Sequence, residues 1–327
     1  TVLAVLTNGS LRFTSSELGG MAADVLDVGG PSGTVFLANN GFSGNSLDRS
    51  LRTGSGISLR FTTTDVAVAS AVGIHADGPL SFEGAVLLVS TGAAALTTGG
   101  SLPVFVRDGA NRIDPALHLT NRPLDIASAS LVLGGGGSFT TPISVTNGAF
   151  TLESGEFLAN LDVSLPPIAL DDGVLRIESN AAFRLTRTFG SNSHGISDAP
   201  AGGGTFRLAG GTFDHGPVVF TVAPRFIWSG GVLAGETLFI CQSNLFVTGP
   251  DLHTISNSFV QYEAQATVDG GMLVMDGSAA LAAGNGFTPL VVSNGAVIAG
   301  STTNGILMLH DNVFDGTVGV LTVVVFL

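Results

Sequence analysis

The feature that most constrains the fold of this chain is a glycine followed by a short apolar strand, repeated at long and nearly regular intervals. The glycines are Gly173, Gly204, Gly235, Gly271 and Gly305, so the step recurs roughly every 31 to 36 residues. A repeat of this length is typical of solenoids, in which each repeat packs only against its neighbours. The sequence therefore predicts stacked coils rather than one globular core.

Strand signals fill the space between these glycines. Short runs rich in Val, Leu, Ile, Phe and Thr, such as Ser58 to Thr62 and Val218 to Val222, alternate with Gly, Asn, Asp and Ser clusters. Three such strands in each repeat form one triangular coil, which predicts an all-β, right-handed parallel β-helix of roughly nine or ten coils. An antiparallel sandwich is the alternative, because hairpins use the same turn residues, but the long period favours the coil.

Asn-Gly and Gly-Gly pairs mark the expected corners of these coils. Examples are Asn8-Gly9, Asn147-Gly148 and Gly230-Gly231. Asparagine and glycine are the residues that adopt positive φ angles most readily, and tight corners between strands require such angles. We therefore expect these pairs to lie where one strand of a coil gives way to the next.

The repeat predicts a single β-solenoid domain over residues 1–327. The pentapeptide Ser-Leu-Arg-Phe-Thr occurs at 10–14 and again at 58–62, which indicates that the coils begin near the first residue. We expect less regular coils in 1–172, with loops at 29–56 and 108–123, and regular coils of roughly 31–36 residues in 173–327. A third irregular stretch, 190–204, is also expected to leave the coil as a loop.

Composition limits the classes of function. Charged residues make up only 11% of the chain, the net charge is −13, and all twelve basic residues are arginine. An acidic chain without a basic cluster is a poor ligand for nucleic acid or for an anionic membrane surface. The absence of lysine excludes a Schiff base, a P-loop lysine and a lysine isopeptide bond. No run is long and apolar enough for a membrane-spanning helix, so we expect no membrane span.

The last residues of the sequence form an apolar strand without charge or proline. An uncapped final coil exposes backbone donors and acceptors that invite pairing with another strand. We therefore expect a homo-oligomer or a head-to-tail polymer assembled through this segment, whose apolar residues are Val320, Leu321, Val323, Val324, Val325, Phe326 and Leu327.

Residues with chemical potential are sparse and scattered. Asp171-Asp172, His194 and Arg225 resemble the Asp pair, His-Gly and basic cluster of pectin-cleaving β-helix hydrolases, but the lysine of those enzymes has no counterpart here. Neighbouring residues of a strand point to opposite faces, so the Asp pair is interpreted as a solvated turn. Cys241, inside an apolar strand, is expected to be a buried thiol.

The six histidines show no metal-ligand spacing, and neither a calcium-binding nonapeptide nor an EF-hand loop is present. Structural or solvated histidines are therefore expected. We predict no metal, no cofactor, no catalytic residue and no enzymatic activity.

Two segments carry a resemblance to a known group of proteins. Phe226 to Gly235, which contains Trp-Ser-Gly-Gly-Val-Leu-Ala-Gly, and Ser293 to Gly300 resemble corners of bacterial surface β-solenoids of the filamentous-haemagglutinin and autotransporter-passenger type. The resemblance implies an exported protein at the cell surface or outside the cell. The function that we expect is a self-associating structural subunit of a fibre. The alternatives are an adhesin or receptor-binding β-helix that binds glycans through its loops and, less favoured, a polysaccharide-degrading enzyme.

Overall fold

The computed structural model describes residues 2–14, 25–38, 44–90, 92–160, 168–186, 194–198, 202–284, 290–294, 296–300, 306–307 and 313–314. Every regular element within these ranges is a β-strand, and no helix there is long and apolar enough to cross a membrane. Two compact units divide the chain, unit 1 at Thr1–Phe157 and unit 2 at Leu158–Leu327.

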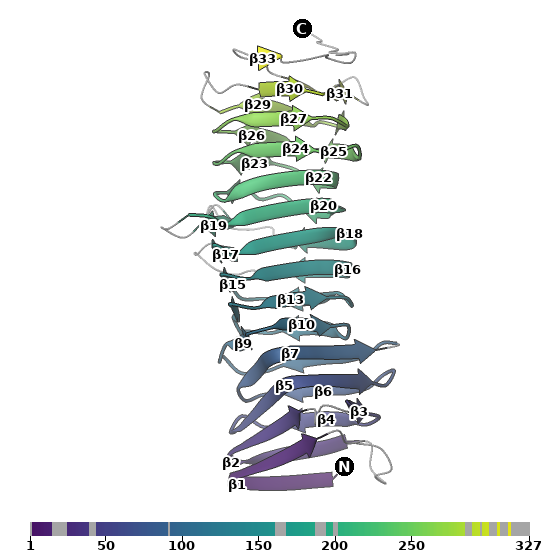
Figure 1. Ribbon diagram of the computed structural model, residues 1–327, viewed down its shortest axis with the longest axis vertical. Coiled ribbons are helices and arrows are strands. Elements are labelled where there is room, and N and C mark those ends of the chain that lie inside the picture. Colours follow the sequence, from purple (N-terminus) through teal and green to yellow (C-terminus); the bar gives the residue numbers. More distant parts are fainter. Residues whose placement is uncertain are drawn as a thin grey trace. The chain divides into compact units, whose positions relative to one another are not determined.

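Both units are parallel β-solenoids. Each strand in the interior of a stack pairs in parallel with a strand one coil earlier and with a strand one coil later, as β12 (Leu124–Ala127) does with β9 (Val104–Arg107) and β15 (Ile143–Thr146). Within each unit the strands stack one above another (Figure 1). The predicted parallel solenoid is confirmed and the antiparallel sandwich is wrong. The described residues form about 12 coils, slightly more than the nine or ten predicted.

Unit 1 has three sheet faces, which the chain visits in the order C, A and B. Face C contains the first halves of β1 (Val2–Thr14) and β2 (Val25–Ala38), then β4 (Ser50–Thr53), β6 (Gly73–Ala76), β8 (Ala95–Thr98), β11 (Ala116–Leu119) and β14 (Gly137–Phe139). Face A contains the second halves of β1 and β2, the first halves of β5 (Ile57–Val68) and β7 (Leu80–Ser90), and β9, β12 and β15. Face B contains β3 (Asn45–Leu47), the second halves of β5 and β7, then β10 (Ala110–Ile113), β13 (Ser130–Leu133) and the start of β16 (Ala149–Ala159).

Unit 2 also has three faces, named D, E and F. Face D contains β17 (Ile168–Asp171), β19 (His194–Asp198), β21 (Phe220–Val222), β23 (Leu238–Cys241), β26 (Phe259–Tyr262), β29 (Ala280–Ala283) and β32 (Ile306–Leu307). Face E contains the first halves of β18 (Val174–Leu185), β20 (Thr205–Asp214) and β22 (Arg225–Ala234), then β24 (Leu245–Thr248), β27 (Ala266–Asp269), β30 (Leu290–Ser293) and β33 (Val313–Phe314). Face F contains the second halves of β18, β20 and β22, then β25 (Leu252–Ser256), β28 (Met272–Asp276) and β31 (Val297–Gly300).

The length of one coil is shorter than the glycine spacing predicted. Register partners in unit 1, such as Leu124 with Ile143 and Val86 with Asn111, define coils of roughly 19 to 25 residues. Among the described pairs of unit 2 the step from Val174 to Thr205 is the longest, and the next step, from Thr205 to Arg225, is about a third shorter. The predicted period was wrong because only its first interval joins equivalent positions, and the later glycines precede strands on different faces.

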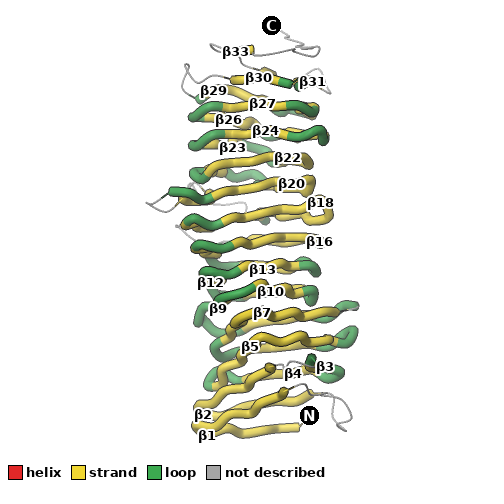
Figure 2. Tube along the Cα trace, in the orientation of Figure 1, coloured by secondary structure: helices red, strands yellow, loops and turns green. Residues whose placement is uncertain are grey.

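Two of the predicted loops are also wrong. Residues 29–56 include the second half of β2 together with β3 and β4, and residues 108–123 include β10 and β11. Glycine, asparagine and proline in these stretches mark short corners between short strands, visible as green segments between yellow ones in Figure 2. The third segment, 190–204, contains strand β19 within its described residues.

The core of each unit follows the alternation of the strands. Inward residues of successive coils lie in register, and in several places identical side chains stack on one another. In unit 1 the rings of Phe61 and Phe82 stack at 5.0 Å between centroids, and in unit 2 Phe206 and Phe226 stack at 4.8 Å. Full burial of such a side chain stabilises a fold by roughly 1.5–3 kcal/mol, and offset aromatic pairs add to this.

The corners follow the turn chemistry expected from sequence. Asn8, Asn147 and Asn294 have φ angles of 56°, 48° and 53°, and Gly231 has a φ of 94°. The Trp-Ser-Gly-Gly segment bends β22 from face E to face F, with the buried Trp228 Nε1–H donating to the carbonyl of Gly230. These corner predictions are confirmed.

Burial of Cys241 is also confirmed, and the surrounding apolar core raises the pKa of its thiol. The predicted assembly segment, Val320 to Leu327, lies outside the described residues. The prediction of one continuous domain over 1–327 stays a prediction.

Candidate functional site

Face C of unit 1 gathers polar side chains on its outer surface. Its strands are short and alternate strictly, so Leu51, Ile74, Leu96 and Leu117 point inward and are buried. The residue after each of these points outward. The sequence Gly-Ile-His-Ala of β6 thus buries Ile74 and Ala76 and leaves the imidazole of His75 on the surface.

These outward residues form one column across five successive coils. Parallel register joins Arg52 to His75, His75 to Thr97, Thr97 to His118, and His118 to Ser138. Successive coils of a parallel sheet are about 4.8 Å apart, so each side chain lies beside the next. We call these five residues the histidine column.

His75 occupies the centre of a hydrogen-bonded chain of three side chains. Its Nε2 lies 2.8 Å from Oδ1 of Asp77, and its Nδ1 lies 2.8 Å from Oγ1 of Thr97. An ionised carboxylate only accepts hydrogen bonds, so the neutral ring carries its proton on Nε2. Nδ1 is therefore an acceptor, and the hydroxyl of Thr97 donates to it. The order hydroxyl, imidazole, carboxylate is that of a nucleophile, a general base and the group that orients the base.

The charges around this chain are partly exposed. The side chains of His75 and Asp77 are 35% and 28% exposed. Asp77 also faces Arg52, with 3.6 Å between its Oδ2 and the guanidinium Nη2. The guanidinium of Arg52 thus lies on the side of the Asp77 carboxylate that does not contact His75.

A second histidine–hydroxyl pair follows two coils later. The Nδ1 of His118 lies 2.9 Å from Oγ of Ser138. Asp77 has no counterpart here, because the residue two positions after His118 is Thr120. The two pairs therefore share a face and a column, and differ in the carboxylate.

Arg122 lies in the corner between β11 and β12, next to the column, and is fully buried. Its guanidinium donates only to backbone carbonyls of preceding corners, at 2.6 Å to Leu102, 2.7 Å to Gly78 and 3.0 Å to Ala76. Burial lowers the pKa of this guanidinium, and the nearby Asp77 opposes that shift. Arg122 thus ties together the corners of three coils beneath the histidine column.

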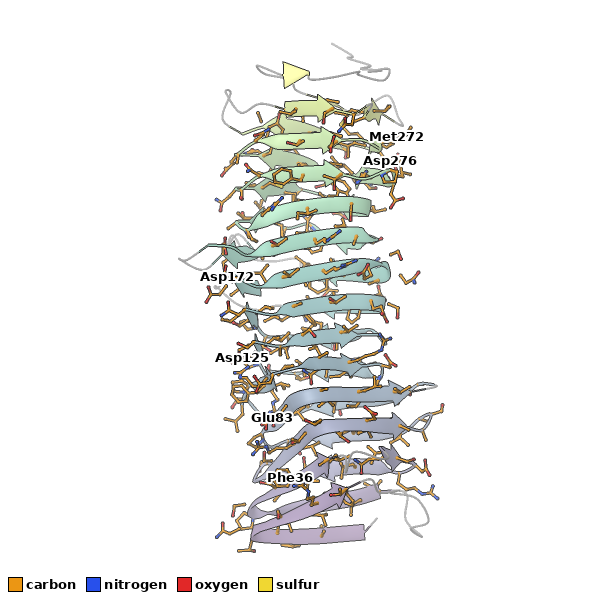
Figure 3. The ribbon with its side chains drawn as sticks, in the orientation of Figure 1. Phe36, Glu83, Asp125, Asp172, Met272 and Asp276 are labelled. Atoms are coloured by element: carbon orange, nitrogen blue, oxygen red, sulfur yellow. The ribbon has the colours of Figure 1, made fainter. Side chains whose placement is uncertain are left out.

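Face A of unit 1 carries a different ladder. The repeated pentapeptides place Arg12 and Arg60 in one outward column, with Phe36 of the intervening coil between them. Their guanidinium carbons lie 5.8 and 5.5 Å from the Phe36 ring centroid. Arg60 also donates to Glu83 at 2.5–2.7 Å. Figure 3 labels Phe36, Glu83 and Asp125, which all lie on this face. Both planes of the Phe36 ring are covered, so this ladder stabilises neighbouring coils rather than presenting an open aromatic surface.

Unit 2 contains a histidine–hydroxyl pair that is completely buried. The Nδ1 of His215 lies 3.0 Å from the carbonyl of Val218, and its Nε2 lies 2.8 Å from Oγ of Ser258. A carbonyl only accepts, so the proton is on Nδ1 and Ser258 donates to Nε2. Burial lowers the pKa of this imidazole. No substrate reaches this pair, since His215 and Ser258 are both 0% exposed.

His253 is buried in the same unit. Its ring nitrogens face carbonyl oxygens only: Nδ1 lies 3.3 Å from Met272, and Nε2 lies 3.1 Å from Trp228 and 3.3 Å from Thr248. The ring also meets the Trp228 indole edge to face, with centroids 5.4 Å apart. His253 thus connects neighbouring coils from inside the core.

The residues that resemble a hydrolase site are not joined by contacts. Asp172 is a left-handed turn residue with a φ of 47°, as the turn interpretation predicted. Arg225 stacks on the ring of Phe246 at 4.5 Å. Within the described part of the chain, no hydrogen bond or ion pair joins Asp171 or Asp172 to Arg225, and the side chain of His194 is not described.

The described residues contain no group of three or more His, Cys, Asp or Glu side chains that could hold a metal ion.

An open depression of about 320 Å³ on face B is lined by Gly44, Asn45, Ser46, Asp65, Val66, Ala67 and Val89. Asp65 is its only ionisable side chain, so the depression holds no acid–base pair. The sequence did not single out Thr97, Asp77 or Arg122, because the register that joins them became known only with the coil length.

Comparison with family models, curated proteins and solved structures finds no match to this chain.

Proposed function

We propose that this protein is a structural subunit of a fibre, and that its molecules associate end to end through their coils. The observation that carries the proposal is the edge of β1. Among the described strands β1 pairs with β2 alone, although it is 13 residues long and spans two faces. A long edge strand is a template for another strand.

The first coil also leaves its core partly open. Leu11 and Phe13 of β1 point inward, yet both are only half-buried, whereas their register partners Val35 and Leu37 in β2 are 0% exposed. A further coil stacked on β1 would cover Leu11 and Phe13 as the first coil covers Val35 and Leu37. Burial of apolar surface would therefore add to the backbone pairing along this edge.

The partner in this proposal is the C-terminal segment of a second copy. Val320 to Leu327 is a run of apolar and β-branched residues without charge, which suits a strand that pairs along one edge. Addition of this strand to β1 would continue the parallel sheet from one molecule into the next. Head-to-tail contacts that repeat along one axis do not close on themselves, so they produce filaments.

A location at the cell surface or outside the cell belongs to the same proposal. It is supported by the resemblance of the Trp-Ser-Gly-Gly corner to filamentous-haemagglutinin and autotransporter-passenger repeats, together with the solenoid fold. Glycan binding through loops is less well supported, because two of the three segments proposed for it, 29–56 and 108–123, contain strands of the coil.

The test uses the chain 1–327 and two variants with complementary defects. One variant carries Leu3→Lys and Val5→Lys, at two β1 positions that are each 66% exposed, because lysine on an edge strand hinders addition of another strand. The other variant lacks residues 320–327. Wild-type protein should form filaments in a concentration-dependent way by electron microscopy and sedimentation. Each variant alone should form none, and an equimolar mixture should stop at heterodimers, because each variant retains one of the two complementary ends.

The matched control is Leu252→Lys with Met272→Lys. These residues are 55% and 43% exposed and lie in register on face F, away from any strand edge. This control should assemble like wild type. Wild-type protein that remains monomeric, or filaments that persist in both end variants, would contradict the proposal.

A further inference from the structure

We propose that Thr97 is an activated hydroxyl nucleophile that accepts acyl groups from small activated esters, with His75 as its base and Asp77 as the residue that positions the base. This reactivity goes beyond the structural role proposed above and rests on different residues.

The two hydrogen bonds of His75 have a fixed direction. Asp77 holds the proton of His75 on Nε2 at 2.8 Å, so the lone pair of Nδ1 points at the Thr97 hydroxyl, also at 2.8 Å. The Thr97 hydroxyl has one other acceptor, the carbonyl of Ile74, at a longer 3.4 Å. A hydroxyl becomes a useful nucleophile when a neighbouring imidazole is ready to take its proton.

Solvent and small solutes can reach the three side chains. All three point out of the sheet, and none of them is fully buried. In the next coil His118 is the register partner of Thr97, so the hydroxyl lies between two imidazoles.

The reaction is an ordinary acyl transfer. The Oγ1 of Thr97 attacks the ester carbonyl while Nδ1 of His75 takes the hydroxyl proton, and Asp77 stabilises the resulting imidazolium. When the tetrahedral intermediate collapses, the bond to the alcohol oxygen breaks, and that oxygen leaves with the proton from Nδ1. Water then attacks the acyl-threonine with the help of the same base, which releases the acid and restores the hydroxyl.

The substrate class follows from the shape of the site. The column lies on an outer sheet face of short, alternating strands, and the depression on face B is lined by other residues. Acyl donors with good leaving groups, such as aryl esters, need the least stabilisation and are the class expected to react.

The chain is well suited to the measurement. It contains no lysine, so acylation of side-chain amines does not obscure acylation of a hydroxyl. The His118–Ser138 pair is an internal control, since it offers the same imidazole–hydroxyl contact at 2.9 Å without a carboxylate two positions further along the chain.

The experiment measures p-nitrophenyl acetate hydrolysis and mass-spectrometric mapping of a fluorophosphonate adduct, whose formation releases fluoride. Wild-type protein should carry the adduct on Thr97, and Thr97→Val should lose it. His75→Gln should lower the rate about 100-fold, a typical contribution of a general base. Thr97→Ser should retain activity, which separates loss of the hydroxyl from misfolding.

Asp77→Asn tests the positioning residue. The neutral amide can donate to Nε2 as well as accept from it, so it no longer fixes the proton there. Both the rate and the rise of the rate with pH should therefore fall, while circular dichroism stays that of the wild type. Ser138→Ala should change neither readout. An adduct spread equally over Thr97 and Ser138, or a wild-type rate in Thr97→Val, would overturn the proposal.

Discussion

Unit 1 and unit 2 place histidines on opposite sides of the same kind of sheet. His75 and His118 in unit 1 point outward beside hydroxyl residues, whereas His215 and His253 in unit 2 are 0% exposed. The two strands differ in whether the histidine occupies an inward or an outward position of the alternating pattern. In Gly-Ile-His-Ala the isoleucine precedes the histidine and takes the inward position, whereas in Leu-His-Thr-Ile the isoleucine follows two positions later and shares its face with His253.

This comparison shows that a histidine in a solenoid acquires its role from its neighbours. An inward ring needs partners inside the core, and both buried histidines find carbonyl or hydroxyl groups of other coils. An outward ring is free to meet solvent and solutes.

Arg122 provides the strongest test of inward polar residues. Arg122→Met removes the donors to the carbonyls of Ala76, Gly78 and Leu102, of which Ala76 alone keeps a second donor, the backbone N–H of Gly99. We expect the free energy of unfolding to fall by about 3–5 kcal/mol in urea titrations, since each orphaned buried group costs about 1–3 kcal/mol. The control Arg60→Met removes an exposed pair with Glu83 and should cost at most about 1 kcal/mol. Equal losses in the two variants would contradict the structural role of Arg122.

His253 compares directly with His118. His253→Ala leaves a cavity beside Trp228 and removes the imidazole N–H donor from a site lined by three carbonyls, so unfolding free energy should fall by about 3 kcal/mol. His118→Ala trims an outward side chain and should cost about 0.5 kcal/mol or less. Urea titrations of the two variants measure both losses of unfolding free energy. A larger loss in His118→Ala than in His253→Ala would contradict the division between outward and inward histidines.

His215 predicts a pH dependence of stability. Burial lowers the pKa of its imidazole in the folded state, so the unfolded chain binds the proton more readily. The stabilisation is complete above the unfolded pKa of about 6.5 and is lost as pH falls from there toward the lower folded pKa. The loss is at most about 1.4 kcal/mol per pH unit for one group. His215→Gln should flatten this part of the curve measured between pH 7 and 5, whereas an unchanged slope would rule out His215 as its source.

Tyr262 predicts the smallest effect. Its hydroxyl is buried without a hydrogen-bond partner, and burial raises its pKa. Tyr262→Phe removes an unsatisfied polar group with little change in shape, so unfolding free energy should stay the same or rise by about 1 kcal/mol. A loss of more than about 1 kcal/mol would show that the hydroxyl has a partner after all.

The fold class and the positions of the corners could be predicted from the sequence, because both depend on the conformational preferences and polarity of neighbouring residues. Asn147 and Gly231 adopt the positive φ angles that their residue types favour, and Cys241 is buried with its apolar strand. The period was wrong because corners of all three faces use the same residues, so glycine spacing alone does not identify equivalent positions.

The histidine column depends on that period. Thr97 lies one coil after His75, and His118 lies one coil after Thr97, so each contact appears only when the true coil length is known. Arg122 was missed for a related reason. Its acceptors are backbone carbonyls of preceding coils. Every residue has such a carbonyl, so the side chains of the sequence do not indicate which carbonyls lie near Arg122.

The division between inward and outward histidines is tested most directly by the tautomers of two rings. Imidazole ¹H–¹⁵N NMR at neutral pH should show the proton of His75 on Nε2, held by Asp77, and the proton of His215 on Nδ1, held by the Val218 carbonyl. The His215 proton should exchange slowly with solvent and the His75 proton quickly. The same tautomer in both rings, or rapid exchange at His215, would contradict the account.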